Sequence, residues 1–122
     1  MRNFLRAGAI SVAVLALAAS AQAAGMDGMV GTWKWTDYTI ECKAGGANGM
    51  SCLVIDGPKN KGMEMVQSKL EPKDGAFVGD IKHPATGDLY KAKMLLKDAD
   101  NWSMDGCTAA GVCASGVFTR IK

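Results

Sequence analysis

Gly31-Thr32-Trp33-Lys34-Trp35 is the stretch of sequence that decides the fold. Trp33 and Trp35 lie two residues apart, so on an extended chain both rings face the same side and can enter one core. Near the other end of the sequence, Arg120 follows a strand-like run, and its guanidinium can cover one ring of that pair. A first and a last strand that meet in this way predict a closed sheet.

Short runs rich in aromatic and β-branched residues follow one another along the chain and are separated by turn-forming residues. The run at 63–71 also fits helical spacing, and we assign it as a strand because its neighbours are strands. Such a pattern is typical of a β-sandwich or an up-and-down barrel. We therefore expect an all-β fold of about eight strands, at 31–36, 38–43, 51–56, 63–71, 76–82, 89–96, 102–105 and 114–121.

The start of the chain is typical of a secretory signal peptide. Arg2 and Arg6 precede an apolar run over 7–19, which is too short to span a membrane, and small residues lead to a cleavage point after Ala23. We expect export to an oxidising compartment and one domain over 24–122, with no membrane span. Removing two of fourteen basic residues leaves twelve, against twelve acidic ones, and this balance disfavours nucleic-acid binding.

Four cysteines remain after cleavage, and an even count in a short exported chain is typical of a disulfide framework. Three pairings are open. The spacings favour Cys42 with Cys52 and Cys107 with Cys113, because each pair closes a short loop rich in small residues. A four-cysteine zinc site needs paired C-x-x-C spacing, which this chain lacks, so we expect neither a metal nor a cofactor.

No catalytic motif stands out. His83, the single histidine, sits beside Pro84 in a turn, and no serine lies in a G-x-S-x-G sequence, so we expect a surface histidine rather than a triad member. Met63-Glu64-Met65 and His83 could bind copper(I) through soft ligands, but thioethers also fill irregular cores, and we favour packing. We expect a protein that is not an enzyme.

Several segments resemble one known family. Residues 79–93, GDIKHPATGDLYKAK, resemble the G-x-I-x-x-P-x-x-G-x-x-Y-x-A core of the bacterial domain-of-unknown-function 2147 family, and residues 106–120 are similar to its closing G-C…C…T-R segment. Gly31-x-Trp33 and Cys42…Cys52 resemble its beginning. The resemblance implies an exported, periplasmic or secreted protein with a lipocalin-like up-and-down β-barrel, and it implies no activity. In the lipocalin end-cap an Arg packs over the Trp, which makes Arg120 the expected structural cap.

The aromatic residues bear on two candidate functions. If they line a barrel mouth, the protein is a binding module for a small apolar or amphipathic ligand. If they fill the interior, it is an envelope protein that binds another protein through a sheet edge or loop surface. We favour the binding module. The expected ligand-binding residues are Trp33, Trp35, Tyr38, Phe77, Tyr90 and Trp102.

Overall fold

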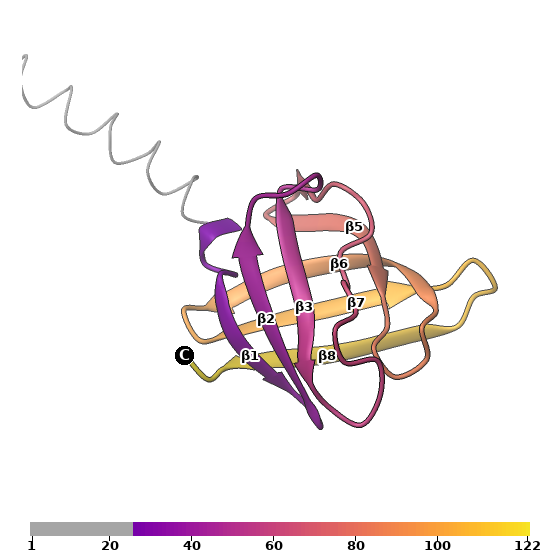
Figure 1. The fold of residues 1–122 in the computed structure, drawn as a ribbon. Helices are drawn as coiled ribbons and strands as arrows, with labels where there is room; N and C mark the ends of the chain where they lie inside the picture. Colours follow the sequence, from indigo (N-terminus) through magenta and orange to yellow (C-terminus); the bar gives the residue numbers. More distant parts are fainter. Residues whose placement is uncertain (1–25) are drawn as a thin grey trace, which may run out of the picture.

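The computed structural model describes residues 26–122, which form one curled antiparallel sheet (Figure 1). The predicted signal peptide at 1–23 lies outside these residues. No helix within 26–122 is long and apolar enough to cross a membrane. The strands are β1 (Gly31–Trp35), β2 (Tyr38–Ala44), β3 (Met50–Asp56), β4 (Glu71–Lys73), β5 (Ala76–Lys82), β6 (Leu89–Asp98), β7 (Asn101–Cys107) and β8 (Cys113–Arg120). The all-β expectation is confirmed.

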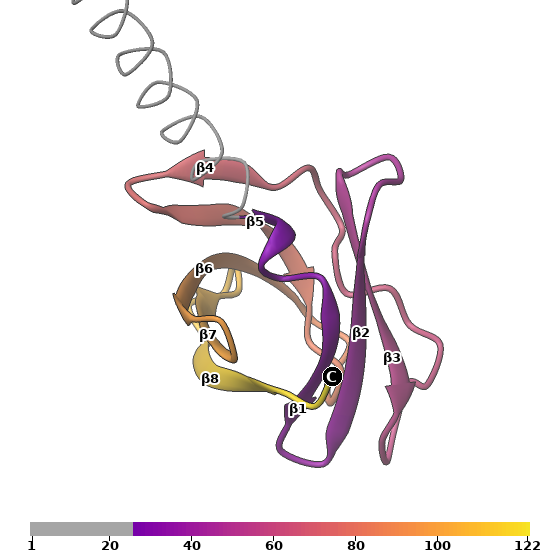
Figure 2. The same cartoon turned by 90° about the vertical axis from the view of Figure 1, so that its left-hand side faces the viewer.

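The first and last strands of the chain pair with each other, and β3 and β4 are the two edge strands of the curled sheet, so the closed sheet that the sequence predicts is an open half-barrel. The strand order is β3-β2-β1-β8-β7-β6-β5-β4, so that β1 lies beside β8 in the middle of the sheet. Trp33 pairs with Arg120 in the antiparallel register, and the Ile121 amide donates a 2.7 Å hydrogen bond to the Thr32 carbonyl. The C-terminus accordingly lies next to β1 (Figure 2). The predicted meeting of the two chain ends is confirmed.

The segment at 63–67 joins β3 to β5, and the expectation of a regular strand over 63–71 is wrong. This segment makes two isolated bridges, Leu53 with Glu64 and Val66 with Ile81. The reason is that a side chain replaces part of the backbone ladder. The Glu64 carboxylate accepts hydrogen bonds from the Ser51 hydroxyl, from the Cys52 amide at 2.8 Å and from the Val66 amide at 2.9 Å. The fourth strand, β4, begins only at Glu71.

Both predicted disulfides are present. Cys42 faces Cys52 across β2 and β3, and Cys107 faces Cys113 across β7 and β8. The first bond is buried in the core, whereas both cysteines of the second are exposed. The two bonds therefore fasten two hairpins with very different access to solvent.

The core lies on the concave side of the sheet. Alternate residues of the strands point inward, as Tyr90, Ala92 and Met94 do along β6, with Lys91 and Lys93 exposed between them. This alternation is the period of two that the sequence shows. The most deeply buried side chains include Trp33, Trp102, Phe118, Met29, Ile40, Met50 and Met94.

Candidate functional site

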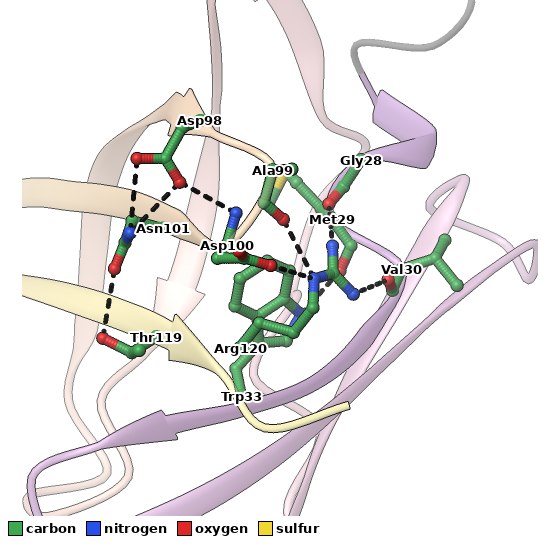
Figure 3. A network of polar contacts seen from close by, with 10 residues as sticks. All are labelled: Gly28, Met29, Val30, Trp33, Asp98, Ala99, Asp100, Asn101, Thr119 and Arg120. Atoms are coloured by element: carbon green, nitrogen blue, oxygen red, sulfur yellow. Dashed lines mark hydrogen bonds and ion pairs between the residues drawn. The ribbon is translucent and has the colours of Figure 1, made fainter.

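One end of the half-barrel is closed by Arg120 (Figure 3). Its guanidinium carbon lies 4.3 Å from the centre of the Trp33 ring. The same group donates three hydrogen bonds to backbone carbonyls, to Ala99 at 2.9 Å, Val30 at 3.0 Å and Gly28 at 2.9 Å. The expected structural cap is therefore present, and it ties the end of β8 to the lead-in before β1 and to the β6–β7 turn.

Gly31 is required by this cap. A Cβ atom at this position would overlap Nη1 of Arg120, and the Gly31 φ of +144° is one that side-chain-bearing residues rarely adopt. The Gly-x-Trp pattern thus has a physical origin here. The glycine leaves room for the guanidinium that covers the tryptophan two residues later.

The β6–β7 turn that meets the cap is held by Asp98. Its carboxylate accepts hydrogen bonds from the Asp100 amide at 2.8 Å and from the Asn101 side chain at 3.1 Å, and these bonds lower the pKa of Asp98. The turn directs the Ala99 carbonyl to the Arg120 guanidinium. The Asp98–Asn101 stretch is thus a tight turn between β6 and β7.

A continuous row of aromatic rings in contact, which we call the aromatic ladder, runs from the cap to the opposite end. Trp33 meets Trp102 edge-on at 5.9 Å, and Trp102 stacks on Phe118 at 4.0 Å. Phe118 then stacks on Trp35 at 5.6 Å, and Trp35 on Tyr38 at 5.8 Å. The aromatic residues of β1, β2, β7 and β8 therefore form one structure that links the closed end to the open one.

A half-open, apolar pocket of about 40 Å³ lies at the open end of the ladder. Trp35 and Phe118 form one wall, His83 and Tyr90 form another, and Met65 lies between the pocket and a smaller void of about 10 Å³ behind it. A cavity holds one water-sized group per roughly 10–15 Å³, so this pocket accommodates about three such groups.

The pocket exists because small residues face inward on β6, β7 and β8. Ala92, Gly106, Ala114 and Gly116 all line it. A Cβ at Gly106 would lie 2.7 Å from a backbone oxygen of β6, and a Cβ at Gly116 would overlap Nε1 of Trp35. The absence of a side chain at Gly116 therefore lets the Trp35 indole pack directly against β8.

His83 lies in the expected turn, and its side chain is half-buried at the rim of the pocket. Its ring lies 5.1 Å from the Trp35 ring and 5.4 Å from the Tyr90 ring. Burial lowers the pKa of His83 below its ordinary value of 6.5, and the negative charge of Asp88 partly opposes this shift. The turn itself is as expected, since the Gly87 amide donates to the His83 carbonyl at 2.7 Å.

The six predicted ligand-binding residues occupy four kinds of place. Trp35 and Tyr90 line the pocket, and Tyr38 supports Trp35 from behind. Trp33 and Trp102 lie in the core, where the Trp33 Nε1–H donates to the Met29 carbonyl at 2.8 Å and the Trp102 Nε1–H has no partner among residues 26–122. Phe77 packs at the edge of the core and does not line the pocket.

Sequence reasoning missed His83, Phe118 and Met104 as pocket residues. Phe118 carries a signal that could have found it, because it alternates with Ala114 and Gly116 on the inward face of β8. His83 carries none, since the place of a turn over the barrel end depends on how β5 and β6 curl.

A wider groove of about 590 Å³ on the outer side of β5 and β6 is a weaker candidate. It is open to solvent, and it is lined by charges of both signs, such as Lys91, whose Nζ lies 4.0 Å from Oδ1 of Asp80. It offers no enclosed apolar surface. The pocket at the end of the aromatic ladder is therefore the candidate site.

The described residues contain no group of three or more His, Cys, Asp or Glu side chains that could hold a metal ion. Met65 is buried in the core, and Met63 packs against the core.

No known protein family, no curated protein and no solved structure matches this chain. The resemblance to the 2147 family thus stays a prediction.

Proposed function

We propose that this protein is a non-enzymatic binding module that takes the apolar end of a small amphipathic molecule into the pocket beside Trp35. The observation that carries the proposal is a half-open apolar cavity at one end of the half-barrel. Aromatic and aliphatic walls with few polar groups are typical of small-molecule sites. Here the size of the cavity limits how much of a ligand can enter.

A pocket of this size contributes more to discrimination between ligands than to tight binding. Complete ligand sites are commonly about 300–1,000 Å³, far larger than this cavity. Burying about three methylene-sized groups contributes at most about 2.4 kcal/mol, at roughly 0.8 kcal/mol each. This corresponds to roughly fifty-fold discrimination between ligands with and without a fitting apolar end. The remainder of the ligand would lie against the rim.

The test is a series of 2-alkanones from butanone to octan-2-one, titrated into the purified protein by NMR. Each added methylene should raise the affinity roughly four-fold until about three groups are buried, after which the affinity should level off. Affinity that does not depend on chain length, or that keeps rising through octan-2-one, would contradict a small pocket of this kind.

Filling the pocket by a substitution provides a second test, with a matched control on the same strand. Ala114→Leu places a larger side chain inside the pocket, because Ala114 lines it from β8. Val117→Leu makes an enlargement on the exposed face of the same strand. We expect the first variant to lose the chain-length dependence and the second to retain it.

A second candidate, an envelope protein that binds another protein, is favoured by the nearly filled interior. Leu53 and Ile55 are exposed large apolar residues two apart on β3, where a partner could bind. In either case we propose that the protein is exported, after cleavage of residues 1–23, to the periplasm or the exterior. Support comes from the basic and apolar leader and from the two disulfides.

A further inference from the structure

The hydrogen bonds of His83 fix which edge of its ring is available to a ligand. The Ala85 amide donates to Nδ1 at 3.1 Å, so Nδ1 carries no proton and Nε2 does. The turn holds the ring in place, since the His83 amide also donates to the Asp88 carbonyl at 2.9 Å. His83 therefore presents a single N–H donor whose direction is set by its own turn.

This donor is unused and accessible. Nε2 of His83 has no hydrogen-bond partner among residues 26–122, and it does not belong to the buried polar atoms left without one. The ring lines the pocket and contacts Trp35 and Tyr90. An N–H at this rim lies where the polar part of an amphipathic ligand would remain once its apolar end is inside.

The pocket has no charge to offer such a ligand. None of the described residues that line it is a lysine, arginine, aspartate or glutamate. A carboxylate brought against these walls would lose hydration without gaining a cation, which is costly. A neutral carbonyl oxygen loses much less and needs only one donor.

We infer that the ligand class of this pocket is neutral amphipathic molecules with a carbonyl acceptor next to a short apolar end, such as ketones, esters or amides, and that His83 Nε2–H is the group that selects them. The inference rests on the proposed function, because it names the ligand class of the same pocket. His83 acts as a specificity-determining residue and not as a catalytic one.

The experiment compares three probes on the purified protein at pH 8, namely hexan-2-one, hexanoate and toluene. Hexan-2-one should bind at least ten-fold more tightly than hexanoate, although both carry an alkyl chain. His83→Phe keeps a ring against Trp35 but removes the donor. It should weaken hexan-2-one roughly five-fold, the size of one neutral hydrogen bond, and leave toluene unchanged.

His83→Gln serves as the rescue variant, because its side-chain amide restores an N–H donor. It should recover part of the hexan-2-one affinity that His83→Phe loses. If His83→Phe binds hexan-2-one as tightly as the parent protein does, the inference is overturned while the proposed function stands. If the parent protein binds neither toluene nor hexan-2-one, the proposed function fails and the inference fails with it. Equal binding of hexanoate and hexan-2-one would also overturn the inference.

Discussion

Replacing Arg120 with alanine removes the cap at the closed end of the half-barrel. Three charge-assisted hydrogen bonds to the Gly28, Val30 and Ala99 carbonyls are lost, together with the contact to the Trp33 ring. The side chain is 25% exposed, so we assign about 1 kcal/mol to each bond and about 1 kcal/mol to the ring contact. About 1 kcal/mol of regained side-chain freedom offsets part of this loss.

The expected result is a decrease of about 3 kcal/mol in the free energy of unfolding, measured by urea or thermal denaturation. For a domain of this size the melting temperature should fall by roughly 12 °C or more. Asp100→Ala is the matched control, because it removes an ion pair of 3.5 Å whose carboxylate side chain is 70% exposed. Such a pair contributes little, so the control should lose less than about 1 kcal/mol. An Arg120→Ala protein within 1 kcal/mol of the parent would refute the reasoning.

Gly31 provides an independent check on the same cap, because a Cβ there would overlap the Arg120 guanidinium. Gly31→Ala should destabilise the parent protein by displacing the guanidinium and by forcing alanine to φ +144°. In the Arg120→Ala background only the backbone part should remain, so the two effects should be clearly less than additive. Full additivity would mean that the glycine and the arginine act separately.

Three further predictions concern other parts of the fold. Glu64→Gln should lower the free energy of unfolding by about 2 kcal/mol and speed amide hydrogen exchange at 63–67, because the Glu64 carboxylate accepts three hydrogen bonds there. Unchanged amide exchange would contradict the role of Glu64 in holding this segment. A mild reductant should reduce the exposed Cys107–Cys113 bond before the buried Cys42–Cys52 bond. Mass-spectrometric mapping of alkylated thiols measures the order, and the reverse order would disprove the difference in solvent access. The lowered pKa of His83 means that His83 takes up a proton at higher pH in the unfolded chain than in the folded one. The free energy of unfolding should therefore decrease as the pH falls below 6.5, and His83→Gln should lack this pH-dependent part. An NMR titration that gives the ring a pKa at or above 6.5 would contradict the burial.

The strands and the cap could be predicted because they leave periodic or paired signals in the sequence. Trp33 and Trp35 lie two apart on one face, and the cysteine spacings close short hairpins, so local rules suffice. The Arg120 contact joins β8 to the start of β1, and it could be anticipated because the sequence predicts that the first and last strands meet.

The pocket and the closing segment could not be predicted in the same way. Glu64 replaces backbone pairing by side-chain hydrogen bonds, which periodicity does not report. The hollow arises from glycines and alanines, such as Gly116 and Ala114, whose role is visible only once Trp35 is placed against them. His83 enters the site because its turn folds over the barrel end, and that placement depends on tertiary structure.

The central claim is that ligands enter at the Trp35 end of the aromatic ladder, and the three indole N–H signals in a ¹H–¹⁵N NMR spectrum test it most directly. The Trp33 N–H is held by the Met29 carbonyl, the Trp102 N–H is buried in the core, and the Trp35 N–H lies against Gly116 in the pocket wall. Titration with hexan-2-one should shift the Trp35 signal in a saturable way and leave the Trp33 signal in place. Saturable shifts confined to Trp33 and Trp102, or no saturable shift at Trp35, would contradict the account.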